Sequence, residues 1–215
     1  MEKDIAAIRR EYTRNYLNKN ETPSDPFELF RLWLDQAINS EEKEPTAMLV
    51  ATATPDGRPS TRTVLLKEVS TDNKFIFYTN YESRKGKQIE SNPYVSLSFV
   101  WHQLERQVHI EGRAEKVSPE QSDAYFRSRP YKSKVGARVS PQSRPIGSRM
   151  EIMQAFMKES LKYTGREIER PDWWGGYAVT PVRMEFWQGR SNRLHDRILY
   201  TLQKDGKWEK ERIAP

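Results

Sequence analysis

The segment from Trp187 to Arg197, which reads WQGRSNRLHDR, holds the densest group of residues that could carry chemistry. If residues 193–199 form a strand, alternation of side chains places Arg193, His195 and Arg197 on one face. Three cationic or titratable groups on one face are unfavourable without an anion between them. The pattern therefore predicts a negatively charged, planar ligand, because guanidinium groups bind such ligands in their own plane.

The protonation of His195 follows from its neighbours. Arg193 and Arg197 disfavour an imidazolium, so we expect a neutral ring that can accept a hydrogen bond. The alternative is an ordinary solvated arginine cluster. The aromatic pair Phe186-Trp187 before the cluster and the histidine within it argue against that alternative.

Arg62 and Lys67 lie five residues apart in a strand-like run. In a regular strand they point to opposite faces and are separated by roughly 16 Å, at about 3.3 Å per residue. The spacing predicts that they serve two different anions. For Lys67 alone, a strand end in solvent is the simpler alternative.

Further groups suited to anions occur at expected helix ends. Tyr78 and Thr79 lead to Arg84 and Lys85 at a helix start, where backbone N–H groups favour an anion. An ordinary capped surface helix is the alternative there. Tyr125, Arg129 and Ser133 suit a phosphate, against a surface alternative, and Gln142-Ser143 is a weaker candidate. Side chains such as Gln107, Trp173, Trp174 and Trp187 more often belong to a protein core.

Composition bounds the class of protein. The chain has 215 residues, 36% hydrophobic and 31% charged, with 24 aromatic residues (6 Trp, 10 Tyr and 8 Phe) that favour a folded chain. Net charge is +6 without a long basic run, so we expect no nucleic-acid partner. Cysteine is absent and three histidines are scattered, so disulfides are excluded and no metal site is predicted. Without a signal-peptide core or a long apolar run, we expect a soluble, cytoplasmic protein with no membrane association.

Local patterns predict the elements. Asp25-Pro26 caps a helix with Phe27, Phe30, Leu34 and Ile38 on its buried face. Strands are expected over 47–54, 60–68, 74–80, 94–101, 106–117, 176–187, 193–203 and 208–213. Short helices are expected over 83–91, 119–128 and 148–163, with a loop over 129–147. Hairpin spacing without βαβ alternation predicts a mainly β fold with peripheral helices (α+β), an antiparallel barrel of Greek-key type.

The chain resembles the pyridoxine/pyridoxamine 5′-phosphate oxidases along nearly its whole length. The similar segments, in chain order, are RTVLLK at 62–67, FYTN at 77–80, SRK at 83–85, LERQV at 104–108, SRP at 128–130, EFWQG at 185–189, RLHDR at 193–197 and RIAP at 212–215. The RLHDR segment is the most specific of these.

The resemblance implies an FMN-binding split β-barrel that forms a homodimer with two FMN sites at the subunit interface. It implies a flexible closing segment over 1–20 and a single domain over 21–215. The FMN-binding residues that it implies are Arg62, Thr63, Val64, Leu65, Leu66, Lys67, Tyr78, Thr79, Arg84, Lys85, Gln107, Gln142, Ser143, Trp187 and Arg197.

The implied activity is oxidation of pyridoxamine 5′-phosphate and pyridoxine 5′-phosphate to pyridoxal 5′-phosphate, with O2 consumed and H2O2 released. Arg193 and His195 are the implied catalytic residues. The implied substrate-binding residues are Arg9, Arg10, Glu11, Tyr12, Lys67, Tyr125, Arg129, Ser133, Arg193, Leu194 and His195. A non-catalytic flavin- or pyridoxal-phosphate-binding protein of the same fold is the main alternative. A nucleic-acid binder is a weaker one.

Overall fold

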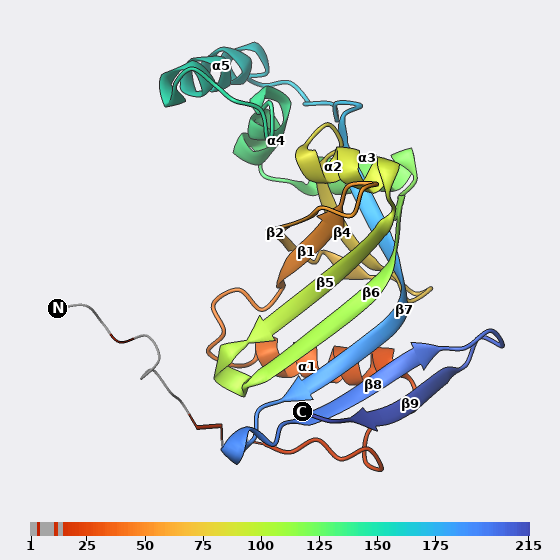
Figure 1. The fold of residues 1–215 in the computed structure, drawn as a ribbon. Helices are drawn as coiled ribbons and strands as arrows, with labels where there is room; N and C mark the ends of the chain where they lie inside the picture. The colour runs from red at the N-terminus through yellow and green to blue at the C-terminus, as the bar shows by residue number, and fades with distance from the viewer. Residues whose placement is uncertain (1–3, 5–10, 13–14) are drawn as a thin grey trace. The chain divides into compact units, whose positions relative to one another are not determined.

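The computed structural model describes residues 4, 11–12 and 15–215, and it divides into two compact units. Unit 1 comprises Met1–Leu49, Ser96–Glu111 and Pro181–Pro215. Unit 2 comprises Val50–Val95 and Gly112–Thr180. In Figure 1 the chain colours show that each unit is assembled from segments far apart in the sequence. The predicted division of the chain at residue 20 stays a prediction.

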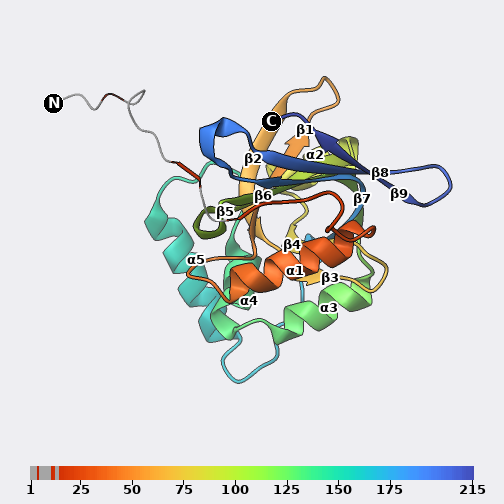
Figure 2. The same cartoon turned by 90° about the horizontal axis from the view of Figure 1, so that it is seen from below.

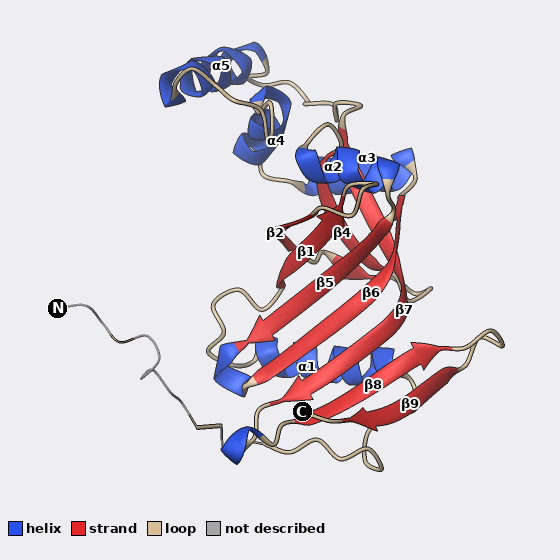
Figure 3. Cartoon of the chain, viewed as in Figure 1, coloured by secondary structure: helices blue, strands red, loops and turns tan. Residues whose placement is uncertain are grey.

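The described residues form one nine-stranded sheet with the order β2-β1-β5-β6-β7-β4-β3, while β8 pairs with β7 and with β9. Its pairs β3–β4, β4–β7, β7–β8 and β8–β9 are antiparallel, as predicted. Figure 3 shows the strands in red and the helices outside the sheet. The strands are β1 (Ala47–Ala53), β2 (Pro59–Leu65), β3 (Glu68–Val69), β4 (Phe75–Asn80), β5 (Tyr94–Trp101), β6 (Arg106–Lys116), β7 (Trp174–Gln188), β8 (Asp196–Leu202) and β9 (Trp208–Ile213).

Unit 1 is built around α1 (Pro26–Ile38). The predicted cap is confirmed, because the Asp25 carboxylate accepts a hydrogen bond from the Phe27 N–H at 2.9 Å. The predicted buried face is partly wrong, since Ile38 is 54% exposed. The helical repeat instead buries Trp33, whose ring meets Phe186 edge-on at 5.3 Å. The residues that α1 buries are Pro26, Phe27, Leu29, Phe30, Trp33 and Ala37.

Unit 2 carries four helices: α2 (Arg84–Ser91), α3 (Pro119–Ser128), α4 (Tyr131–Val139) and α5 (Arg149–Lys162). Helix α4 lies within the predicted loop over 129–147, so that prediction was wrong. Contacts with α5 stabilise it: Arg138 pairs with Glu159 at 2.9 Å, and the Tyr131 hydroxyl donates to the Ser160 carbonyl at 2.6 Å. Figures 1 and 2 both show α4 and α5 side by side. Of the described helices, none is both long enough and apolar enough to cross a bilayer.

The turn between β7 and β8 differs from the predicted strand over 193–199. Gln188 pairs with Asp196, so β8 begins at Asp196. Ser191–Arg193 form a short 3-10 turn in which Asn192 and Arg193 have φ values of 57° and 60°. Both values lie in the left-handed region, which is unfavourable for residues with a side chain. Arg193 therefore precedes the strand in a strained turn.

Candidate functional site

Unit 2 contains a cavity of about 1040 Å³. Its walls come from β2, β4, the start of α2, the end of α3, α4 and the loop that follows α4. Leu66 does not line the cavity; it is 4% exposed and belongs to the core. The cavity brings together most of the expected FMN and substrate residues, namely Arg62, Thr63, Val64, Leu65, Lys67, Tyr78, Thr79, Arg84, Lys85, Tyr125, Arg129, Ser133, Gln142 and Ser143.

The charge of this cavity wall is one-sided. Its described lining contains five basic side chains and no aspartate or glutamate. Grouped cations without carboxylates raise one another's electrostatic energy, which an anionic ligand would lower. The five residues are Arg62, Lys67, Arg84, Lys85 and Arg129.

Lys85 lies deepest among these cations and is 6% exposed. Its Nζ donates to Thr79 Oγ1 at 2.8 Å, Gln142 Oε1 at 3.0 Å and Ser83 Oγ at 3.2 Å. All three acceptors are neutral, so nothing there balances the charge. Burial, followed by the nearby Arg62 guanidinium, lowers the pKa of Lys85 to about 8. An anion bound beside Nζ would stabilise the charged form and raise the pKa again.

The N-terminus of α2 shapes the same end of the cavity. Ser83 caps the helix by accepting from the Gly86 N–H at 3.3 Å, and the helix begins where the sequence predicted it. Arg62 is held by the Val50 carbonyl at 3.1 Å and by the hydroxyls of Thr52 and Ser60 at 2.6 and 2.7 Å. These partners are again neutral. Burial, then repulsion from Arg84, lowers the pKa of Arg62.

The predicted separation of Arg62 and Lys67 is only partly correct. β2 ends at Leu65, so Lys67 lies beyond the strand and the alternation of faces does not reach it. Both side chains line the same cavity. They can still serve different anions, because a cavity of this size accommodates more than one small charged group.

Three stacked aromatic rings form another part of the wall. Tyr78 stacks on Tyr125 with ring centroids 3.8 Å apart and on Trp174 at 5.6 Å, both with an interplanar angle of 13°. Gly176 permits this arrangement, because a Cβ there would lie 2.8 Å from the Tyr78 ring. Burial raises the pKa of Tyr78 to about 12 and also raises that of Tyr125, so both phenols are neutral near pH 7.

Arg129 supplies a cation with spare hydrogen-bonding capacity. Its guanidinium lies 4.5 Å from the Trp174 ring centroid and 5.6 Å from that of Phe126. Its buried Nη1 has no hydrogen-bond partner. A buried donor without a partner costs free energy, so the site fits an incoming acceptor such as a phosphate oxygen. Burial lowers the pKa of Arg129.

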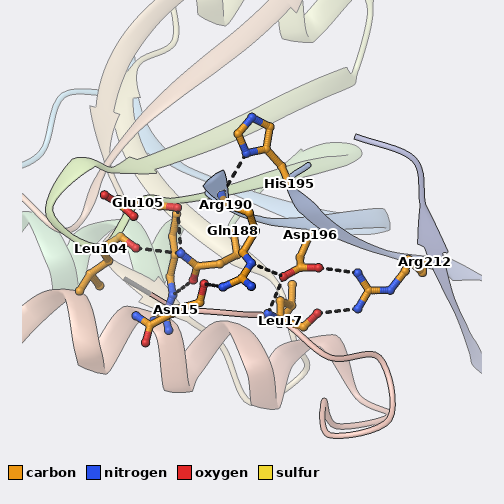
Figure 4. A network of polar contacts seen from close by, with 10 residues as sticks. Asn15, Leu17, Leu104, Glu105, Gln188, Arg190, His195, Asp196 and Arg212 are labelled. Atoms are coloured by element: carbon orange, nitrogen blue, oxygen red, sulfur yellow. Dashed lines mark hydrogen bonds and ion pairs between the residues drawn. The ribbon is translucent and has the colours of Figure 1, made fainter. Parts of the chain in front are cut away.

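A second group of expected site residues lies in unit 1 and consists of Tyr12, Trp187 and His195. The rings of Trp187 and His195 are 4.6 Å apart between centroids. Tyr12 meets each of them edge-on at 5.7 Å. Figure 4 shows His195 beside Arg190 and Asp196 in a network of polar contacts.

A backbone contact determines the tautomer of His195. The Arg190 N–H donates to His195 Nδ1 at 3.1 Å. Nδ1 therefore carries no proton, and the neutral ring has its proton on Nε2. Burial, then repulsion from Arg193, lowers the pKa of His195, which agrees with the neutral ring predicted from sequence. The ring thus accepts a hydrogen bond through Nδ1, as expected, and its other nitrogen, Nε2, is left as a donor.

The expected common face of Arg193, His195 and Arg197 is wrong, because only Arg197 lies in β8. Arg197 donates from Nε to Glu185 at 2.7 Å and from Nη1 to the Ala214 carbonyl at 2.8 Å, and the Glu185 bond raises its pKa. Leu194 is 69% exposed.

The remaining expected residues have separate surroundings. Gln107 in β6 is half-buried and its Oε1 lies 3.2 Å from His109 Nε2. Glu11 is exposed. Arg9 and Arg10 fall outside the described residues.

Sequence reasoning missed two kinds of residue. Trp174 was assigned to the core, but it also lines the cavity, and Gly136 and Ala137 on α4 line it too. Their contribution depends on a helix that the sequence did not predict. Asp196 was noted only as a motif residue, yet its carboxylate bonds Arg212 at 2.6 Å. The alternation of a strand could not identify this contact.

Comparisons with known proteins agree with the resemblance. Residues 34–162 match a family model described as pyridoxamine 5′-phosphate oxidase. Residues 174–215 match one described as pyridoxine 5′-phosphate oxidase C-terminal dimerisation region. Two relatives are named pyridoxine/pyridoxamine 5′-phosphate oxidase. The one from Bacteroides thetaiotaomicron is 67% identical to this chain, and the one from Porphyromonas gingivalis is 61% identical to it. The first match covers 99% of this chain and 100% of the relative, and the second covers 97% of each.

Solved structures confirm the fold. PhzG from Burkholderia lata, in complex with tetrahydrophenazine-1-carboxylic acid, has a TM-score of 0.88 at 28% identity, covering 96% of this chain and all of that one. A pyridoxamine 5′-phosphate oxidase-related, FMN binding protein from Nostoc punctiforme has a TM-score of 0.72 at 19% identity, covering 90% and 100%. The predicted split-barrel fold class is thereby confirmed.

Proposed function

Since this chain belongs to the pyridoxamine 5′-phosphate oxidase family, we propose that the cavity of unit 2 binds FMN and the phosphate of the substrate. The chain is an oxidoreductase that converts pyridoxamine 5′-phosphate and pyridoxine 5′-phosphate to pyridoxal 5′-phosphate with FMN as its cofactor. We further propose that O2 is the electron acceptor and that H2O2 is released. A cytoplasmic location stays a prediction.

The one-sided charge of the cavity is the observation that carries this proposal. FMN and the substrate each bring a phosphate, and the five basic side chains suit two such groups. Lys85, Arg62 and Arg84 would hold the FMN phosphate, helped by hydroxyl and amide groups at Thr79, Gln142 and Ser143. When bound, FMN supplies a ring that accepts two electrons from the substrate.

The substrate phosphate is assigned to the two remaining basic residues of the lining, Arg129 and Lys67. Arg129 has an unpartnered buried Nη1, and it is held in place by Trp174 and Phe126. Tyr125 and Ser133 line the same cavity with hydroxyl groups, and Lys67 adds a further charge. A tetrahedral phosphate can accept from several such donors at once.

Arg193 and His195 are proposed to position and polarise the pyridine ring of the substrate. The Nε2–H of His195 would donate to an oxygen or nitrogen of the substrate, because its Nδ1 is occupied by the Arg190 N–H. The planar guanidinium of Arg193 suits stacking on the ring and stabilises negative charge on the ring oxygen. Hydride transfer depends on such placement at the scale of about 1 Å.

A homodimer is the proposed assembly. Residues 174–215, which include Trp187, Arg193, His195 and Arg197, match a region described by its role in dimerisation. The proposed FMN contacts are divided between unit 2 and the residues Gln107, Trp187 and Arg197 of unit 1. Such a division is expected where two copies of one chain build a site together.

The visible spectrum of the purified protein tests the proposal. We expect flavin absorbance that bleaches when pyridoxamine 5′-phosphate is added without air and returns when air is admitted. Pyridoxamine without its phosphate is the matched control and should bleach the flavin far more slowly. Flavin that stays oxidised with the phosphorylated substrate would identify a non-catalytic binding protein, and no flavin binding at all would refute the cavity assignment.

A further inference from the structure

The carboxylate of Asp196 joins three separate segments of unit 1. Its Oδ1 accepts from Arg212 Nη1 at 2.6 Å, and its Oδ2 accepts from the Leu17 N–H at 3.0 Å. Arg190 Nε lies 3.5 Å from the same Oδ2. The Asp196 side chain is 18% exposed, so solvent only partly screens these charged contacts. One carboxylate thus contacts the N-terminal segment, the turn after β7, and β9.

The two arginines that contact Asp196 also bind the N-terminal segment directly. Arg212 Nη2 donates to the Leu17 carbonyl at 2.7 Å, and Arg190 Nη1 donates to the Asn15 carbonyl at 2.9 Å. Figure 4 shows these bonds on both sides of Asp196. Charge-assisted hydrogen bonds are shorter and stronger than neutral ones. We call Asp196, Arg190 and Arg212 the clamp, because together they bind the backbone of residues 15–17.

The clamp is connected to two of the expected substrate-binding residues, His195 and Tyr12. The Arg190 N–H fixes the orientation of His195 through Nδ1. Tyr12 precedes Asn15, which the clamp binds, by three residues. The Cα atoms of Tyr12 and Asn15 are therefore at most about 11 Å apart, at ~3.6 Å per residue. The Tyr12 ring packs on Trp187 and His195, and Gly189 makes room, because a Cβ there would lie 2.7 Å from the Tyr12 ring.

We propose that Asp196 is a positioning residue that binds residues 15–17 to the turn after β7 and so places Tyr12 and His195 for the substrate. This inference rests on the proposed function, since it concerns the substrate of that reaction. Asp196 itself does not touch the substrate. Without its charge, Arg190 and Arg212 lose their common anion and the Leu17 N–H loses an ionised acceptor. Tyr12 and His195 then sample other positions, which weakens substrate binding.

Asp196→Asn tests the proposal, because it keeps the size of the side chain and removes the charge. We expect the KM for pyridoxamine 5′-phosphate to rise about tenfold, in the range of one lost charge-assisted hydrogen bond, while the Kd for FMN stays unchanged. Glu111→Gln is the matched control, because it breaks an exposed ion pair with Arg183 in the same unit at 2.7 Å. That variant should keep the wild-type KM.

A double-mutant cycle with Tyr12→Ala separates positioning from a general loss of stability. If Asp196 acts partly through the N-terminal segment, the effects of Asp196→Asn and Tyr12→Ala on KM should be less than multiplicative in the double variant. Arg212→Gln removes a more exposed member of the clamp and should also raise the KM. This variant tests the proposal if Asp196→Asn fails to fold.

Two outcomes would overturn the clamp. A wild-type KM in Asp196→Asn or in Arg212→Gln is one. Fully multiplicative effects of Asp196→Asn and Tyr12→Ala on KM are the other. If the wild-type enzyme reduces its flavin with substrate, either result refutes the proposed role of Asp196 and leaves the proposed function intact. A wild-type protein that never reduces its flavin refutes the proposed function instead.

Discussion

The buried ammonium of Lys85 leads to a quantitative prediction for cofactor binding. Its environment lowers its pKa from the ordinary value of 10.5 to about 8. At ~1.4 kcal/mol per pKa unit, this shift corresponds to about 3 kcal/mol of unfavourable environment for the charge. A phosphate that restores an ordinary pKa gains a similar free energy from the charged side chain. Lys85→Met should therefore weaken FMN binding roughly 100-fold near pH 7.

The pH dependence of FMN binding has a definite sign. Below about pH 8 the free protein already carries a charged Lys85, so affinity is high and nearly constant. Above that pH the free side chain loses its proton, while the phosphate keeps it protonated in the complex. Binding then requires uptake of a proton, and the affinity should fall by up to about tenfold per pH unit.

Quenching of FMN fluorescence measures both effects, with Kd determined at several values between about pH 7 and pH 9.5. The wild type should weaken above about pH 8, whereas Lys85→Met should be weaker throughout and insensitive to pH in this range. Lys87→Met is the matched control, because Lys87 is an exposed lysine on the same helix. Equal affinities for Lys85→Met and the wild type, or a wild-type affinity independent of pH, would refute the reasoning.

Three other predictions concern the substrate and the assembly. Arg129→Ala should weaken binding of phosphorylated substrate by about 1.5–3 kcal/mol with FMN occupancy unchanged, measured as KM and flavin content; loss of FMN instead would assign Arg129 to the cofactor. Arg193→Met keeps bulk without charge and should lower kcat/KM roughly 100-fold, measured by anaerobic stopped-flow reduction of the flavin. A wild-type reduction rate in that variant would leave Arg193 as a surface charge. Light scattering of the holoprotein should give the mass of a dimer, and a flavin-loaded monomer would contradict the proposed assembly.

Local signals in the sequence predicted the elements that depend on local chemistry. Helix starts at Asp25, Ser83, Ser118 and Ser148 were all recognisable, because each side chain caps the helix that follows it. Helix α4 has no side-chain cap and buries only Val135. It is stabilised by contacts with α5 such as the Arg138–Glu159 pair, whose members are 21 residues apart in the chain, so no local pattern revealed it.

The candidate site divides in the same way. The resemblance identified residues such as Arg62, Lys85 and Arg129, but not that they line one cavity without a carboxylate. The absence of carboxylates from the described lining depends on where the chain places its acidic residues in three dimensions. The alternation of side chains along a strand cannot predict that placement. The strand argument for Arg193 and His195 failed because the pairing of Gln188 with Asp196 determines where β8 begins. The neutral ring predicted for His195 agrees with the structure, because burial and then repulsion from Arg193 lower its pKa.

The left-handed backbone at Asn192 and Arg193 has a consequence for how this protein responds to selection. Arginine is disfavoured there by roughly 1 kcal/mol, whereas glycine adopts the same conformation freely. A screen that rewards heat resistance alone would therefore favour Arg193→Gly and discard the guanidinium proposed for the reaction. Thermal stability and turnover are thus opposed at this position, and thermostabilised variants should be checked for activity whenever residue 193 has changed.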